Sequence, residues 1–214
     1  MPITTNLINS TINKPEAISE AVKALSAGNL IIFPTETVYG LGCDFFNAES
    51  RKKIYEIKSR SPSKQIAGYI SNIKMINQLV DFLPEIFYKI SEKFLPGPLT
   101  IILKSGKNII SRGFGDTIGI RYPKNDVTLE IIESFGKPMA GTSANISGES
   151  SPVFAMVAFK DFEGLIALII DDGPTCFGAE STVIDISTGK PVLLREGAIR
   201  AGEIEDTIDL KFNN

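Results

Sequence analysis

The chain has 214 residues, of which 43% are hydrophobic and 22% are charged, and its formal net charge at pH 7 is −3. This composition is typical of a soluble globular protein with enough chain to bury a sizeable core. The mild acidity argues against a general nucleic-acid binder, which is usually basic. No run of 18 apolar residues and no signal peptide is visible, and two cysteines are too few for a disulfide framework. A reduced cytoplasmic protein without a membrane contact is therefore expected.

Histidine is absent from the sequence, and the two cysteines are Cys43 and Cys176. This composition excludes catalysis by Ser-His-Asp or Cys-His groups, a histidine general base, and zinc sites built from histidine or several cysteines. We expect no metal site made by protein side chains. Any metal ion would arrive with a nucleotide.

Hydrophobic periodicity predicts helices and strands mixed along the whole chain, with no linker and no internal repeat. In chain order, the pattern predicts a helix at 15–27, a strand at 30–33, a helix at 48–58, a strand at 66–70, helices at 73–80 and 85–94, strands at 99–103 and 117–121, a helix at 126–135, strands at 137–140, 165–170, 181–186 and 192–194, and a short helix after Ala201. We therefore predict an α/β fold of the mixed α+β type, in a single domain over residues 1–214 with one twisted mixed sheet.

Two polar segments follow expected strands. Residues 34–42 read PTETVYGLG, and residues 142–148 read TSANISG. Open α/β sheets place small-molecule sites where strands end, and these hydroxyls, amide and glycines suit a ligand. Taken alone, each segment is also compatible with an ordinary polar loop.

A third segment concentrates positive charge. Between Arg51 and Lys64 there are six cationic residues and one acid, Glu56. Lys58, Arg60 and Lys64 can converge on a polyphosphate, although cations are also favoured at an exposed helix C-terminus. Farther along, Arg121 and Arg195 each end an expected strand, where they can bind an anion or form structural ion pairs.

Seven segments occur in a fixed order: PTETVYGLGCD, KSRSPSK, LPGPLTIIL, GIRYP, GTSANISG, ESTVIDIS and LLREGAI. In this order they resemble the YrdC/Sua5 family of threonylcarbamoyl-AMP synthases, over roughly residues 15–200. The length resembles that of the short bacterial-type members, without the C-terminal domain of longer ones. The resemblance implies a YrdC-like fold, in which helices flank a twisted mixed sheet around a large concave cavity.

The resemblance also implies an activity. Members of the family are nucleotidyltransferases that form threonylcarbamoyl-AMP (L-threonylcarbamoyladenylate) and pyrophosphate from L-threonine, bicarbonate and ATP, with Mg²⁺ carried by the triphosphate. The product is passed to a tRNA threonylcarbamoyl transferase complex for modification of tRNA position 37, and a tRNA contact by the synthase is a further implied partner. Positioning and charge neutralisation suffice for this chemistry, so the absence of histidine is compatible with it.

Site residues are implied by the matching motifs. The threonine-binding residues would be Thr35, Tyr69, Arg121, Gly141 and Ser181, with Arg121 on the substrate carboxylate. The ATP-binding residues would be Lys58, Arg60, Lys64, Thr117, Ser143, Asn145, Ser151 and Arg195. Of these, Lys58, Arg60 and Lys64 would stabilise charge in the transition state. Tyr69 departs from the family pattern, because some members have a histidine at this place.

Two other functions stay open at this point. One is a non-catalytic factor that binds tRNA or double-stranded RNA, since the concave face of family members is basic. The net charge of −3 counts against it. The other is a carbamoyl-transfer domain acting on a different amine, as in hydrogenase-maturation proteins, which are much longer chains with added zinc and acylphosphatase modules.

Overall fold

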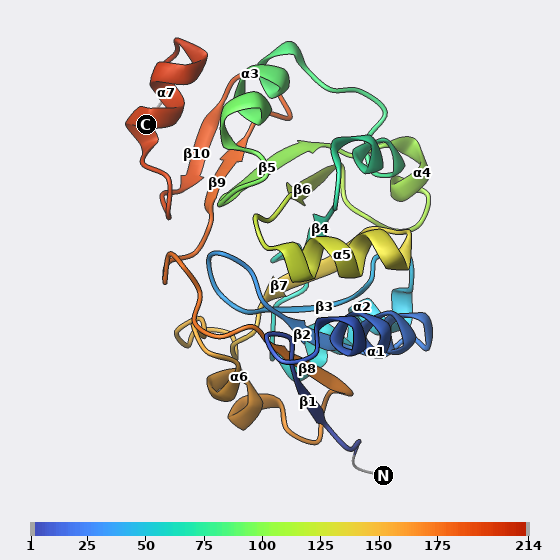
Figure 1. The fold of residues 1–214 in the computed structure, drawn as a ribbon. Helices are drawn as coiled ribbons and strands as arrows, with labels where there is room; N and C mark the ends of the chain where they lie inside the picture. The colour runs from blue at the N-terminus through green and yellow to red at the C-terminus, as the bar shows by residue number, and fades with distance from the viewer. Residues whose placement is uncertain (1–2, 213–214) are drawn as a thin grey trace.

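The computed structural model describes residues 3–212 as a ten-stranded mixed sheet with helices on both sides (Figure 1). The strands are β1 (Asn6–Asn9), β2 (Ile31–Phe33), β3 (Gly40–Asp44), β4 (Ala67–Tyr69), β5 (Leu99–Lys104), β6 (Thr117–Arg121), β7 (Met139–Ser143), β8 (Leu168–Asp171), β9 (Thr182–Asp185) and β10 (Val192–Arg195). The helices are α1 (Lys14–Ser26), α2 (Ala48–Ile57), the 3₁₀ helix η1 (Ile73–Gln78), α3 (Glu85–Phe94), α4 (Lys107–Ile110), α5 (Asp126–Phe135), α6 (Ala155–Phe162) and α7 (Ala201–Ile208). The predicted mixed α/β fold is confirmed.

The strand order across the sheet is β1-β8-β2-β3-β7-β4-β6-β5-β9-β10. Parallel pairs join β1 to β8, β2 to β8, β4 to β6 and β5 to β9, and the other neighbours run antiparallel. Segments far apart in the sequence therefore meet at the centre of the sheet, where β7 lies between β3 and β4.

Asparagine side chains start four of the helical segments. Asn13, Asn47, Asn72 and Asn125 precede α1, α2, η1 and α5, and each side-chain oxygen accepts a hydrogen bond from the backbone N–H three residues later. An N-cap of this kind satisfies a backbone donor that the helix itself leaves unpaired. The local sequence thus specifies these helix starts to within a residue or two of the prediction.

Several elements differ from the prediction. The strand β3 occupies Gly40–Asp44, where a loop was expected, and β7 extends to Ser143, so that the polar segment 142–148 begins inside a strand. The strand β1 and the helices α4 and α6 were not predicted, and the helix expected at 73–80 is the 3₁₀ helix η1. Glycine and short polar residues have low strand propensity, so their place in the sheet follows from pairing with distant neighbours.

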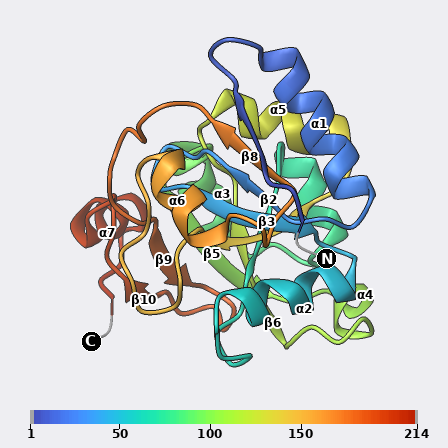
Figure 2. The ribbon, with the colours of Figure 1, turned by 90° about the horizontal axis from the view of Figure 1, so that it is seen from below.

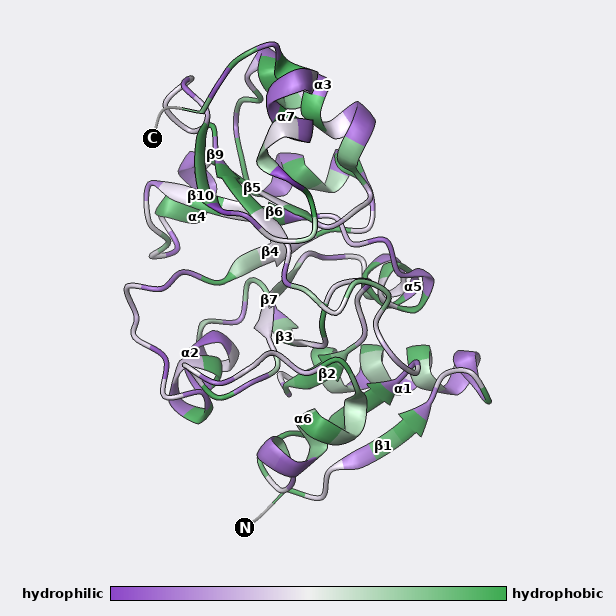
Figure 3. Cartoon of the chain, turned by 90° about the vertical axis from the view of Figure 1, so that its left-hand side faces the viewer, coloured by the Kyte–Doolittle hydropathy of each residue, from purple (hydrophilic) through white to green (hydrophobic). Residues whose placement is uncertain are grey.

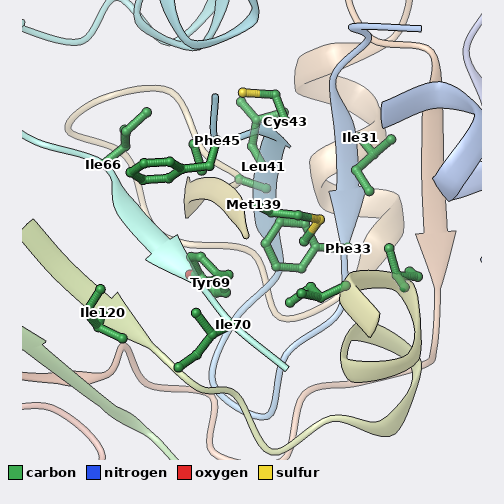
Figure 4. Packing of buried hydrophobic residues seen from close by; sticks show 14 of the residues in the cluster. Ile31, Phe33, Leu41, Cys43, Phe45, Ile66, Tyr69, Ile70, Ile120 and Met139 are labelled. Atoms are coloured by element: carbon green, nitrogen blue, oxygen red, sulfur yellow. The ribbon is translucent and has the colours of Figure 1, made fainter. Parts of the chain in front are cut away.

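Phe33 explains why glycines lie in the central strands. A Cβ atom added to Gly40, Gly42 or Gly141 would lie 2.5, 2.8 or 3.3 Å from the Phe33 ring. The ring also meets Tyr69 edge-on, with centroids 5.2 Å apart (Figure 4). Glycine leaves room for the Phe33 and Tyr69 rings, and these glycines explain why β3 and the end of β7 were expected to be loops although both are central strands.

Helices cover the sheet on both sides. The helices α1 and α5 lie side by side on one side of the strands, and α2 lies on the other (Figure 2). The helix α3 packs against α7 near the β10 edge. Hydrophobic residues are concentrated in the strands, whereas the helices alternate hydrophobic and hydrophilic residues, as expected for elements that cover a core (Figure 3). Within residues 3–212, the helices lack the combined length and hydrophobicity of a membrane span.

Two glycine substitutions should change stability in opposite directions. In Gly42→Ala the new methyl group would lie 2.8 Å from both the Ala140 carbonyl oxygen and the Phe33 ring, so overpacking should lower the free energy of unfolding by about 1–3 kcal/mol. In Gly202→Ala, an exposed position of α7 with no atom within 4 Å of the new methyl group, stability should rise by up to about 1 kcal/mol. Urea unfolding of both variants checks this, and equal effects would contradict the packing explanation.

Candidate functional site

A cavity of about 400 Å³ lies on one face of the central sheet, within the range of small-molecule sites. Its sheet wall is made by residues two apart on successive strands: Gly141 and Ser143 on β7, Ala67 and Tyr69 on β4, Gly119 and Arg121 on β6, Thr100 and Ile102 on β5, with Ser181 and Val183 at β9 and Arg195 on β10. Successive side chains of a strand point to opposite faces, so residues two apart share one face. The strand pairing places Arg121 beside both Tyr69 and Thr100.

The expectation that polar residues at strand ends gather at one site agrees with the cavity lining, since Tyr69, Arg121, Ser143 and Arg195 are each the last residue of a strand. The polar residues lie along the face of six strands, and the opposite face of the same strands carries core residues such as Ile101, Ile118 and Ile120. A usable signal was present in TIGIR at 117–121, where isoleucines alternate with other residue types. Gly119 and Ile102 were not predicted as site residues. The alternation places Gly119 on the same face as Arg121, and the pairing of β5 with β6 places Ile102 opposite Gly119.

The predicted cationic segment forms one side of the cavity. Lys58 is only 1% exposed, and its ammonium group donates to the backbone carbonyls of Ser143 and Asn145. Ser143 Oγ in turn donates to Asn145 Oδ1 at 2.6 Å. Burial lowers the pKa of Lys58 to about 8; nearby Arg60 acts in the same direction, and Glu180 opposes it. This network joins the segments 58–65 and 143–149 on one side of the cavity.

Arg60 shapes the loop that follows. Its Nε donates to the Lys64 carbonyl at 2.9 Å, and a terminal nitrogen donates to the Gln65 carbonyl at 2.8 Å. Burial lowers the pKa of Arg60, although Tyr55 and Glu180 oppose that shift. Lys64 is exposed and lines the same cavity. The three predicted cations are thus brought together around one space.

Arg195 and Glu180 form the other side. Arg195 Nε donates to the Ser181 carbonyl at 3.0 Å, and its guanidinium pairs with the Glu180 carboxylate. Glu180 also accepts from Ser151 Oγ at 2.6 Å. The cavity lining carries five cationic side chains, Lys58, Arg60, Lys64, Arg121 and Arg195, against two acidic ones, Glu149 and Glu180. The excess of positive charge suits an anionic ligand.

Arg121 lies on the sheet wall in a buried ion pair. One terminal nitrogen donates to Glu36 Oε1 at 2.7 Å and to Thr37 Oγ1 at 3.3 Å, and the other donates to the Leu99 carbonyl at 3.3 Å. The side chains of Arg121 and Glu36 are only 2% and 3% exposed. Glu36 was missed by sequence reasoning, although it lies inside the PTETVYG segment.

Ten of the thirteen predicted site residues line the cavity, and Thr35, Thr117 and Ser151 do not. Thr35 Oγ1 donates to the Val38 carbonyl at 2.6 Å and lies 2.9 Å from Thr37 Oγ1, so it holds the loop from which Thr37 and Val38 reach the cavity. Thr117 begins β6 opposite Lys104, at the other end of the strand from Arg121. Ser151 reaches the site only through Glu180.

Ser147 is a further residue of the cavity lining with an unused group. Its buried Oγ has no hydrogen-bond partner within residues 3–212. Over the same residues, no group of three or more histidine, cysteine, aspartate or glutamate side chains is arranged to hold a metal ion. The chemistry that the arrangement itself offers is the binding of anions by cations, hydroxyls and backbone groups.

Comparisons with known proteins identify relatives of the chain. The chain is 39% identical over 205 residues to the threonylcarbamoyl-AMP synthase of Pyrococcus abyssi, covering 92% of this chain and 60% of that protein. It is 39% identical over 199 residues to the threonylcarbamoyl-AMP synthase of Bacillus subtilis, covering 92% of this chain and 57% of that protein. The chain thus spans less than two thirds of the length of either relative.

Among solved structures, P. abyssi Sua5 complexed with L-threonine matches with a TM-score of 0.89 and 36% identity, covering 98% of this chain and 62% of that chain. The Sua5/YciO/YrdC family model, described as "Telomere recombination", matches residues 23–197. The resemblance seen in the seven ordered segments is confirmed: the chain belongs to the Sua5/YciO/YrdC family.

Proposed function

We propose that this protein is an L-threonylcarbamoyladenylate synthase that uses L-threonine, bicarbonate and ATP and releases pyrophosphate. The observation that carries the proposal is one cavity with a buried arginine on its sheet wall and a cluster of cations at its side. An amino acid carboxylate and a triphosphate are the two anions of this reaction. The names of the P. abyssi and B. subtilis relatives support the assignment.

The proposed roles combine the family motifs with the positions of the residues around the cavity. Arg121 would bind the threonine carboxylate, with Tyr69, Gly141 and Ser181 around the amino acid. Thr35 would act through the loop that presents Thr37. The ATP phosphates, with their Mg²⁺, would face Lys58, Arg60, Lys64 and Arg195, while Ser143, Asn145 and Ser147 would contact the nucleotide. Ser151 would act through Glu180, and Thr117 stays a predicted ATP contact.

In the proposed reaction the threonine amine attacks carbon dioxide formed from bicarbonate and loses a proton. The resulting carbamate oxygen attacks the α-phosphorus of ATP, and pyrophosphate leaves with the electron pair of the broken P–O bond. Holding both substrates in one cavity makes their reaction effectively unimolecular. Fixed cations stabilise the negative charge that develops on the leaving group. No side chain needs to act as a nucleophile.

We also propose, from the family resemblance, that the product goes to a tRNA threonylcarbamoyl transferase complex in the cytoplasm. An RNA-binding role for the cationic segment is less well supported by the geometry. Lys58 is 1% exposed and bonded to backbone carbonyls, so it cannot reach the phosphates of an RNA on the surface. Lys58 does line the cavity, so a small ligand bound there would lie next to it.

The purified protein should release pyrophosphate from ATP only when both L-threonine and bicarbonate are present. Serine should be the best substitute, with a kcat/KM roughly 10–200-fold lower, because the loss of one methyl group costs about that much in a fitted pocket. Coupled detection of pyrophosphate with each amino acid in turn measures this. Equal release with serine, glycine or no amino acid would refute the threonine assignment.

The same assay separates the enzyme from an RNA-binding factor. Arg60→Ala should reduce pyrophosphate release strongly, because a cation facing the triphosphate is lost. An RNA-binding surface would instead show a modest loss of RNA affinity, a weaker salt dependence and unchanged ATP turnover. Lys53→Ala, which removes an exposed cation of α2, is the matched control.

Arg121→Lys should weaken threonine binding far more than ATP binding. Lysine keeps the positive charge beside Glu36 but cannot offer two parallel N–H donors to a carboxylate. The loss of one charge-assisted hydrogen bond corresponds to a roughly tenfold to hundredfold weaker threonine affinity. Calorimetry with each substrate measures the effect, and unchanged threonine binding would exclude this role for Arg121.

ATP affinity should fall as the pH rises above about 8, where Lys58 loses its proton. Below that pH the ammonium is charged and attracts phosphate. Above it the affinity should fall by up to about tenfold per pH unit, because one bound proton is coupled to binding. In Lys58→Met, ATP binding should be weaker at pH 7 and the fall above pH 8 should disappear. An unchanged pH profile in this variant would assign the titration to another group, and Lys53→Met is the control.

A further inference from the structure

Glu36 contains a buried oxygen atom that the protein does not use. Its Oε1 accepts a hydrogen bond from Arg121 at 2.7 Å, but its Oε2 is buried and has no hydrogen-bond partner within residues 3–212. The whole side chain is 3% exposed. A buried carboxylate oxygen without a donor is costly, and buried polar atoms are nearly always paired. This oxygen is therefore a suitable acceptor for a hydrogen-bond donor of a bound ligand.

The surroundings hold the Glu36 carboxylate beside the amino acid end of the cavity. Its two polar neighbours, Arg121 and Thr37, both line the cavity, and one Arg121 nitrogen donates to both Glu36 and Thr37. The backbone carbonyl of Glu36 accepts from the Phe177 N–H at 2.9 Å, and the hydroxyl of Thr35 ties down the next turn of the loop. The carboxylate is therefore held in place before any ligand binds.

The charges define the ligand that fits. Arg121 and Glu36 together are neutral, so a ligand carrying only a carboxylate would leave an uncompensated negative charge in a buried place, which is costly. An α-amino acid brings one negative and one positive group a few bonds apart. Its carboxylate matches Arg121, and its ammonium matches the unpaired oxygen of Glu36.

We propose that Glu36 Oε2 accepts a hydrogen bond from the α-ammonium group of the amino acid whose carboxylate binds Arg121. The Glu36–Arg121 ion pair would then favour ligands that carry both an ammonium and a carboxylate group. This inference rests on the proposed function, because it places the amino acid at Arg121. Glu36 is not among the site residues implied by the family motifs, and it is not among the residues that line the cavity. Glu36 would bind and orient the amine before the amine is converted to the reactive neutral form.

The test compares L-threonine with 2,3-dihydroxybutyrate of the same configuration, in which a hydroxyl replaces the ammonium. Calorimetry on the full chain should show that threonine binds at least about tenfold more tightly, the range of a charge-assisted hydrogen bond. In Glu36→Gln, threonine affinity should fall by at least about tenfold, while the affinity for dihydroxybutyrate should stay the same or rise, because Glu36 no longer opposes the ligand carboxylate. Equal weakening of both ligands would overturn the proposal, because a structural role in holding Arg121 affects both.

Controls keep the outcomes separate. Glu56→Gln removes an exposed carboxylate of α2 and should leave both affinities unchanged. If Glu36→Gln does not fold, Glu36→Asp is the variant to use instead. It keeps the charge, so it should retain a preference for threonine over dihydroxybutyrate. Two outcomes with the unaltered protein are also decisive. Equal binding of the two ligands would refute only the proposed role of Glu36. If threonine does not bind, with or without ATP, the proposed function itself is refuted.

Discussion

The central strands serve two purposes at once, because successive residues of a strand point to opposite faces of the sheet. On β5 and β6 one set of residues buries Ile101, Ile118 and Ile120 in the core, and the alternate set forms the wall of the cavity. A shift of one residue in either strand would exchange the two sets. The register that packs the core is therefore the register that assembles the site, and stability and function depend on the same pairing.

The close packing around Phe33 allows this wall to be built. Its ring occupies the space that side chains at Gly40 and Gly42 would need, and the Tyr69 ring, which packs edge-on against Phe33, occupies that space at Gly141. Gly141 and Tyr69 both line the cavity. The glycines thus have low intrinsic strand propensity, but they allow close packing of the aromatic rings against the strands. That packing exists only in the folded sheet.

The cationic side chains of the cavity are oriented mainly by hydrogen bonds to backbone carbonyl groups. Lys58 and Arg60 donate to backbone carbonyl groups, which orient these cations without neutralising them, whereas Arg195 donates to a carbonyl and also pairs with the Glu180 carboxylate. Arg121 pairs with the Glu36 carboxylate, and this ion pair is buried, whereas the Arg195–Glu180 pair is partly exposed. The side of the cavity with Lys58, Arg60 and Lys64 thus keeps an excess of positive charge while the Arg121 end is balanced, and this difference suits the two substrates of the proposed reaction.

The sequence by itself determined the class of the fold, most of the helices, the exclusion of histidine chemistry, and a family resemblance that the comparisons confirmed. These properties depend on local periodicity, capping residues and ordered motifs, which need no knowledge of distant contacts. Only the tertiary structure decided that β3 is a strand, that Gly119 and Glu180 line the cavity, that Thr35 stands behind Thr37, and that Glu36 pairs with Arg121. Residues 36 and 121 are far apart in the chain, and their meeting follows from the order in which the strands pair, which local sequence does not encode.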